Sequence, residues 1–173
     1  SSLMGSIALI RQTFLDAEWY NNNEKLTNIS YDAFTANQKL PQIFVLNDEL
    51  DYSRVYKIAD EFEIDFIVKG NGKEFLRINE IVNANFPLII PINFPNTYEV
   101  SNPENADLIT LRELKNWELS PYNPAILARN EIDFCITSAD LKNSEDFLAK
   151  LRTAVSKGLS KNDALAALTT TPA

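Results

Sequence analysis

The sequence contains no histidine among its 173 residues, and this absence removes more chemistry than any other feature of the composition. A Ser-His-Asp or Cys-His nucleophile cannot be assembled within such a chain, and neither can a zinc site with imidazole ligands. Carboxylates could still bind a hard cation, and Asp, Glu or Lys side chains could still transfer protons. Any enzymatic activity of this chain would have to use those residue types.

Cysteine and clustered positive charge are also scarce. The single cysteine, Cys135, excludes an internal disulfide, and its place inside an apolar run is typical of a packing residue. The formal net charge is −8 and Lys and Arg do not cluster, so we expect no nucleic-acid partner. The opening amphipathic segment, residues 3–19, is interrupted by Arg11, Asp16 and Glu18 too often for a membrane span. We therefore expect no membrane partner, and the cellular compartment stays open.

Short apolar runs at residues 43–46, 66–69 and 88–92 recur at regular intervals, with helical patterns between them. Their apolar residues are consecutive rather than alternating, which is typical of parallel strands buried on both faces. A further run of this kind covers residues 133–137. Because proline cannot donate to a ladder, Pro91 predicts an edge, a bulge or an irregular end in the third run. The pattern predicts the α/β class, built from parallel β/α units.

We expect a single domain or fragment over residues 1–173, with a helical lead-in at residues 1–40 and β/α units at residues 41–173. A chain that opens on a helix, without a leading strand, is interpreted as part of something longer. Two architectures fit the order of elements. One is part of a TIM-type (β/α)8 barrel, and the other is a small open doubly wound α/β sheet.

Several segments resemble strands five to seven of the amidohydrolase superfamily barrel, especially its imidazolonepropionase-like branch. They are residues 41–45 (PQIFV), 58–62 (IADEF), 67–70 (IVKG) and 86–91 (FPLIIP). Residues 134–140 (FCITSAD) are similar to strand eight, and residues 158–173, which end in TTTPA, are similar to the closing helix with its Thr-x-x-Pro-Ala pattern. The resemblance covers residues 41–173. It implies that the half of the barrel that carries the His-x-His metal motif is missing from this chain.

The resemblance implies a metal-dependent hydrolase of non-peptide carbon–nitrogen bonds, which typically uses a divalent metal such as zinc. In that family, histidines at the ends of strands five and six bind the metal, and an aspartate at the end of strand eight activates the bound water. Here strand five ends in Asn47 and Asp48, and the strand-six position is Gly70, preceded by Lys69. Ala139 aligns with the aspartate, and Asp140 follows one residue later. These departures imply that this chain binds no metal cofactor by itself.

Polar residues gather where the predicted strands end, which is the edge where parallel α/β folds bind ligands. The candidate substrate-binding residues are Asn47, Asp48, Asn71, Asn93 and Ser138, and the candidate catalytic residues are Lys69 and Asp140. Together they could bind a polar small molecule. Turns also favour Asn, Asp and Ser, and Asp140 could simply lead into the next helix. Lys69 is not a turn former, and burial could convert it into a base.

The leading interpretation is a fragment of an amidohydrolase-like protein, non-catalytic by itself and retained for packing or ligand binding. One alternative is an active hydrolase that uses Lys69 and carboxylates. Another is a flavodoxin-like module that binds a small molecule, although Gly70-Asn71-Gly72 lacks the full spacing of a phosphate-binding loop. A half barrel exposes two strand edges and an apolar interior, so the expected partners are the rest of the parent barrel or a second copy of the chain.

Overall fold

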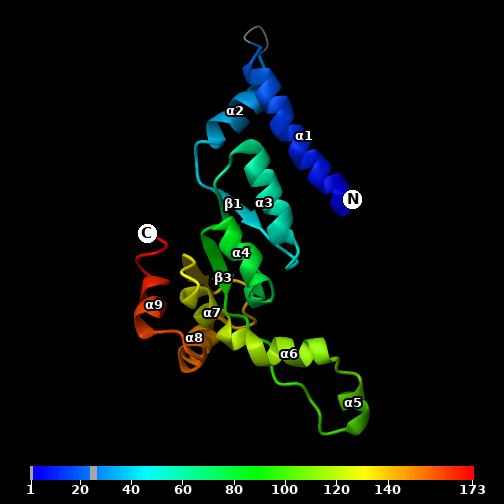
Figure 1. The fold of residues 1–173 in the computed structure, drawn as a ribbon, viewed down its shortest axis with the longest axis vertical. Helices are drawn as coiled ribbons and strands as arrows, with labels where there is room; N and C mark the ends of the chain where they lie inside the picture. The colour runs from blue at the N-terminus through cyan, green and yellow to red at the C-terminus, as the bar shows by residue number, and fades with distance from the viewer. Residues whose placement is uncertain (1, 24–26) are drawn as a thin grey trace.

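The fold was analysed in a computed structural model that describes residues 2–23 and 27–173, apart from the side chain of Asn105 (Figure 1). The strands are β1 (Gln42–Val45), β2 (Phe66–Lys69), β3 (Leu88–Pro91) and β4 (Phe134–Thr137). The α-helices are α1 (Leu3–Asn21), α2 (Ile29–Asn37), α3 (Asp51–Phe62), α4 (Ile78–Ala84), α5 (Pro103–Asp107), α6 (Leu111–Leu119), α7 (Asn123–Arg129), α8 (Phe147–Ser156) and α9 (Lys161–Ala166). Short 3-10 turns are η1 (Glu74–Arg77), η2 (Ser120–Tyr122) and η3 (Ser144–Asp146).

The four strands form one parallel sheet in the order β1-β2-β3-β4, which confirms the predicted α/β class. Each crossover moves one strand further in the same direction. A doubly wound sheet instead reverses its strand order at a switch point. The described sheet has no such reversal, so the doubly wound alternative is wrong.

Pro91 explains where the ladder between β2 and β3 stops. Val68 pairs with Leu88 and Lys69 pairs with Ile89, and the N–H of Gly70 donates to the carbonyl of Ile89 at 3.0 Å. The next donor from β3 toward β2 would be the nitrogen of Pro91, which carries no hydrogen. The proline therefore gives β3 an irregular end, one of the three outcomes predicted for it, although the strand lies inside the sheet.

The two faces of the sheet differ in burial, which corrects the prediction that both are buried. One face is covered and includes a row across the sheet in which Val68, Leu88 and Phe134 are buried. The other face, which we call the open face, includes Ile43, Val45, Ile67, Lys69, Ile89 and Cys135, all exposed or half-buried, while Pro91 at its carboxyl end is buried. Successive right-handed crossovers in one direction place their helices on one side of a sheet, which accounts for the difference.

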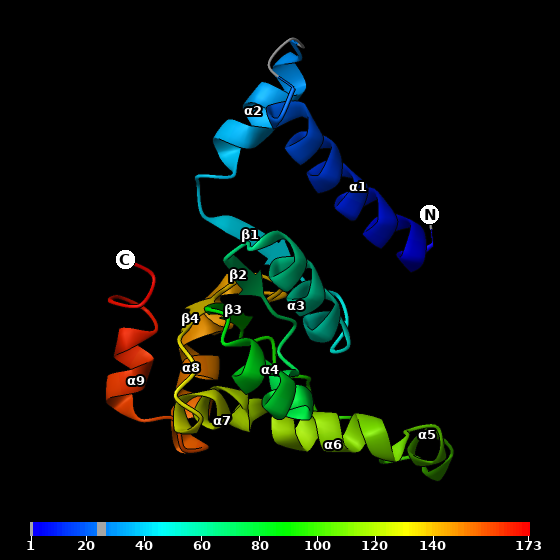
Figure 2. The ribbon, with the colours of Figure 1, turned by 45° about the horizontal axis from the view of Figure 1, so that its top comes forward.

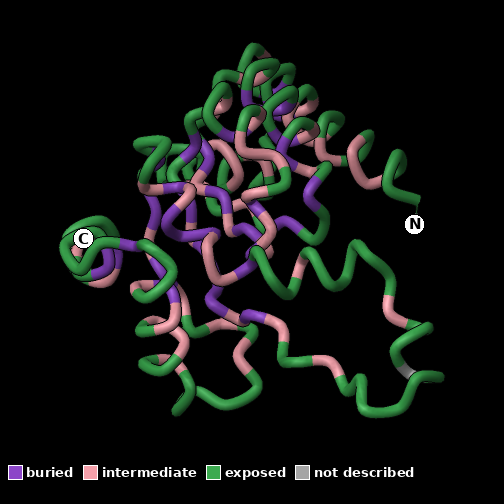
Figure 3. The backbone as a smooth tube through the Cα atoms, turned by 60° about the horizontal axis from the view of Figure 1, so that its bottom comes forward, coloured by how far each residue is buried: buried purple, intermediate pink, exposed green. Residues whose placement is uncertain are grey.

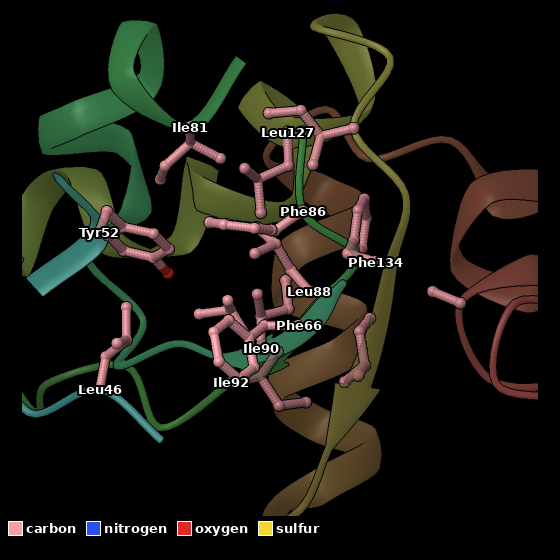
Figure 4. Packing of buried hydrophobic residues seen from close by; sticks show 14 of the residues in the cluster. Leu46, Tyr52, Phe66, Ile81, Phe86, Leu88, Ile90, Ile92, Leu127 and Phe134 are labelled. Carbon is pink, nitrogen blue, oxygen red and sulfur yellow. The ribbon is translucent and has the colours of Figure 1, made fainter. Parts of the chain in front are cut away.

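The hydrophobic core lies between the covered face and the helices. Figure 4 shows Leu88, Ile90 and Phe134 converging with Tyr52 of α3, Ile81 of α4 and Leu127 of α7. In Figure 3 the buried residues gather at the centre of the molecule, while the N-terminal segment is drawn largely as exposed and intermediate. The core thus fixes the positions from which the strand ends project.

Helix α1 forms as predicted and packs against α3. The rings of Phe14 and Phe62 stack with centroids 5.0 Å apart, and Nε of Arg11 donates to Glu61 at 2.7 Å. The pair α1 and α2 extends beyond β1 in Figures 1 and 2. In the part of the chain that the structure describes, no helix has both the length and the apolar character needed to cross a membrane.

Candidate functional site

The structure brings the two candidate catalytic residues together at the carboxyl edge of the sheet. Nζ of Lys69, the last residue of β2, lies 2.9 Å from Oδ2 of Asp140 in the turn after β4. The side chain of Lys69 is 24% exposed and that of Asp140 is 52% exposed. Lys69 therefore ends its strand paired with a carboxylate from two strands away.

Asp140 reaches this position through an unusual backbone conformation. Its φ of 67° lies in the left-handed region, which Asp tolerates better than most residues. The N–H of Leu141 donates to the carbonyl of Ser138 at 3.3 Å, which closes the turn. The interpretation of Asp140 as a helix-entry residue is wrong, because η3 begins at Ser144 and is capped by Asn143.

Asn47, Asp48 and Asn71 serve the loops that connect strands to helices. Nδ2 of Asn71 donates to the carbonyl of Asn47 at 3.4 Å, and Oδ1 of Asn71 accepts from the N–H of Lys73 at 3.1 Å. Oδ1 of Asp48 accepts from the N–H of Leu50 at 2.7 Å, which is the geometry of an Asx turn. The side chains of Asp48 and Asn71 are thus used within the fold, whereas Asn47 takes part in these bonds through its backbone carbonyl.

Asn93 and Asp140 line a surface hollow of about 410 Å³ beside the Lys69–Asp140 pair. Lys142 and Lys150 also line it, and Nζ of Lys150 donates to the carbonyl of Phe94 at 3.0 Å. The hollow offers amide and ammonium donors beside carboxylates, which suits a polar small molecule. Ser138 is exposed and is not among the residues that line this hollow.

This edge does not fit the divalent metal that the family resemblance implies. The strand-six position is Gly70, which has no side chain to bind a metal, and the ammonium group of the preceding Lys69 offers no lone pair and would repel a cation. Within residues 2–23 and 27–173, no cluster of three or more Cys, Asp or Glu side chains is placed to hold a metal ion. We derive no chemical step through a metal.

A buried carboxylate that the sequence analysis missed organises the loop between β2 and α4. Glu74 is fully buried, and its Oε1 accepts from the N–H groups of Asn71 and Gly72 at 2.9 and 3.0 Å. The same oxygen accepts from the hydroxyl of Tyr52 at 3.0 Å, and Oε2 accepts from the side-chain amide of Asn123. Because a buried carboxylate is tolerated only when it is hydrogen-bonded, this network ties α3, the loop and α7 together.

Burial raises the pKa of the Tyr52 hydroxyl far above its usual range, and the neighbouring Glu74 raises it further. Tyr52 therefore stays protonated and donates to the carboxylate. Oδ1 of Asn123 also accepts from the N–H of Phe75 at 2.9 Å. Both the nitrogen and the oxygen of this amide are therefore hydrogen-bonded to η1. The sequence offers only a weak signal for the network, an acidic residue in the first turn after Gly70-Asn71-Gly72.

An ion pair that the sequence analysis did not predict joins the carboxyl edge to α6. Arg112 of α6 contacts Glu49, whose side chain is 10% exposed, in the loop after β1. Helix α6 begins at Leu111, because Thr110 and Glu113 form a complete capping box. The sequence carries this signal as the Thr110-x-x-Glu113 pattern.

Comparison of the chain with family models, curated proteins and solved structures finds no match. Functional inference about this chain therefore rests on its residues and their geometry.

Proposed function

We propose that this chain is an amidohydrolase-like barrel segment, non-catalytic by itself, that presents a polar small-molecule site at its carboxyl edge. The observation that carries the proposal is the open face of the sheet. In a (β/α)8 barrel the strands follow one another in sequence, the helices lie outside, and alternate side chains fill the interior. Here the strands are sequential, and the open face corresponds to such an interior.

The register across the open face supports the proposal. Val45, Lys69, Ile89 and Cys135 form one row across all four strands. Because register-paired residues of parallel strands point to the same face, the whole row would face the interior of a barrel, whose layers take their side chains from alternate strands. A row of this kind, left partly exposed, is what a barrel segment would present to the remaining strands of a parent barrel or to another chain.

The paired state of Lys69 supports the non-catalytic half of the proposal. A lysine acts as a base or nucleophile through a free amine, whereas Nζ of Lys69 is engaged with Asp140 at 2.9 Å. The competing proposal, an active hydrolase that uses Lys69 and Asp140, is favoured by one observation only, the proximity of these two groups. A flavodoxin-like module would require the reversal of strand order that the described sheet does not have.

A hydrolysis assay with metal analysis tests this proposal. The purified chain is incubated with a panel of lactams, cyclic imides and aryl amides, with and without added Zn²⁺ or Mn²⁺, and its metal content is measured by elemental analysis. We expect no turnover above buffer and far less than one metal per chain. Turnover by the wild type that Lys69→Met abolishes would establish the competing hydrolase. A full equivalent of tightly bound metal would overturn the non-catalytic assignment.

A further inference from the structure

The outer edge of β1 presents backbone groups that the described fold leaves unused. In the described part of the chain β1 is bonded to β2 alone. The N–H of Leu46 donates to the carbonyl of Lys69 at 2.9 Å. Because successive residues of a strand turn their N–H and C=O groups to opposite sides, Phe44 faces β2 as Leu46 does, while Ile43 and Val45 face outward. These two residues are 60% and 53% exposed.

The opposite edge of the sheet is already engaged, which corrects the expectation of two unpaired edges. The N–H of Ile136 in β4 donates to the carbonyl of Ala167, just after α9, at 3.1 Å. This contact uses an outward donor of β4, because Leu88 bonds to Asp133 on the other side of that strand. Head-to-tail pairing of β1 with β4 of another copy would have to displace the C-terminal segment.

The chemistry of β1 lacks the usual protection of an edge strand. Gln42–Val45 contains no charged residue and no proline, and Ile43 and Val45 are apolar and exposed. Natural edge strands are generally shielded by charges, prolines, bulges or a covering helix or loop, and none of the first three is present within β1 itself. Since the formal net charge of the chain is −8, two copies would approach with the least repulsion at a neutral segment such as this one.

We propose that the chain forms a two-fold symmetric dimer in which β1 pairs antiparallel with β1 of a second copy. Residue 43 of each copy then lies opposite residue 45 of the other, and each of these two pairs exchanges both N–H···O bonds. A register centred on residue 43 would place residue 45 opposite Pro41 of the other copy, which has no N–H. A register centred on residue 45 would leave outward groups of the strand unmatched. The register centred on Phe44 satisfies the outward groups of Ile43 and Val45.

A two-fold contact between identical strands is closed, because each copy uses the same surface. Because Ile136 on the β4 edge is already bonded to Ala167, we expect assembly to stop at the dimer rather than continue into fibres. The open faces of both copies lie on one side of the resulting eight-stranded sheet, since each copy contributes four strands. This inference does not depend on the amidohydrolase resemblance.

The test combines sedimentation equilibrium with a matched pair of variants of the full chain. We expect the wild type to sediment as a dimer at micromolar concentration. Val45→Pro removes an N–H that the monomer does not use and should give a monomer with an unchanged far-UV circular dichroism spectrum. Val45→Thr keeps the N–H and the strand preference and should remain dimeric. A monomeric wild type, or a folded Val45→Pro variant that still dimerises, would overturn the proposal.

Disulfide trapping tests the register independently of the proline variant, which keeps the proposal falsifiable if that variant does not fold. In the Ile43→Cys/Val45→Cys/Cys135→Ser chain, opposed residues should have Cα atoms within disulfide range, so mild oxidation should yield a covalent dimer. The Val45→Cys/Cys135→Ser control has no opposed thiol in this register and should remain largely uncrosslinked. Equal trapping of both chains, or of neither, would contradict the proposed register.

Discussion

At the scale of the residue, the most constrained position is Gly70, which follows Lys69 at the end of β2. A Cβ built there would lie 2.1 Å from Oε1 of Glu74 and 2.5 Å from the hydroxyl oxygen of Tyr52. Both atoms belong to the buried hydrogen-bond network and cannot move without leaving a buried polar group unpaired. The absence of a side chain at residue 70 is therefore what allows the carboxylate of Glu74 to approach the loop.

We predict that Gly70→Ala lowers the free energy of unfolding by about 1–3 kcal/mol, the usual cost of overpacking a buried site. Urea denaturation followed by circular dichroism measures the change. Gly5→Ala is the control, because a Cβ there meets only Oγ of Ser2 at 3.4 Å and alanine favours the helical conformation of α1. If the two variants have the same free energy of unfolding, the close approach of Glu74 and Tyr52 to Gly70 does not contribute to stability as proposed.

At the scale of the element, helix α3 depends on a carboxylate in its first turn. Burial alone would raise the pKa of Asp51, but hydrogen bonds from Arg54 and from the backbone N–H groups of Asp48 and Asn47 outweigh it and lower that pKa below its usual value. The ionised side chain also interacts favourably with the dipole at the N-terminus of the helix. Asp51 thus links the end of β1 to the start of α3.

We predict that Asp51→Asn costs about 1 kcal/mol of stability at pH 7. Because the folded-state pKa is lowered, the contribution of Asp51 is fully present above its unfolded-state pKa, near 4, and is lost as the pH falls through the lower folded-state value. Urea titrations at pH 7 and pH 3 should therefore show the gap between wild type and variant shrinking with acidification. Arg54→Met removes one partner only and should give a smaller gap with the same sign. A gap that is independent of pH would contradict this account.

At the scale of the whole molecule, the open face determines which surfaces are available for assembly. Cys135 lies on this face in the row with Ile89, and burial raises the pKa of its thiol. Its sequence context predicted a core residue, and that prediction was wrong because the thiol is only half-buried in the described sheet. As the sole cysteine, it reports on the open face without further engineering.

We predict that Cys135 reacts with a thiol reagent in the native protein, more slowly than a free cysteine peptide because of its raised pKa, and faster as the pH rises. The matched control is Val68→Cys/Cys135→Ser, which places the thiol on the covered face, where Val68 is 0% exposed. That thiol should react only on unfolding. Native protection of Cys135 equal to that of the control would mean that the open face is covered in solution.

The sequence by itself determined the class of fold, the parallel strands and the connecting helices. These follow from local patterns, because consecutive apolar residues and helical periodicity are properties of short segments. The absence of histidine likewise fixed which chemistries the chain could not perform. Residue patterns also placed Lys69 and Asp140 at strand ends, since the carboxyl ends of parallel strands share one edge.

Only the tertiary structure decided which face of the sheet is buried, and that Lys69 meets Asp140 across the edge. It also decided that Glu74 is buried beneath Gly70 rather than exposed at the start of a helix. Each of these features depends on contacts between residues far apart in the chain. The residue pattern of a strand cannot distinguish a face covered by helices from a face left exposed, because the same apolar residues occur on both.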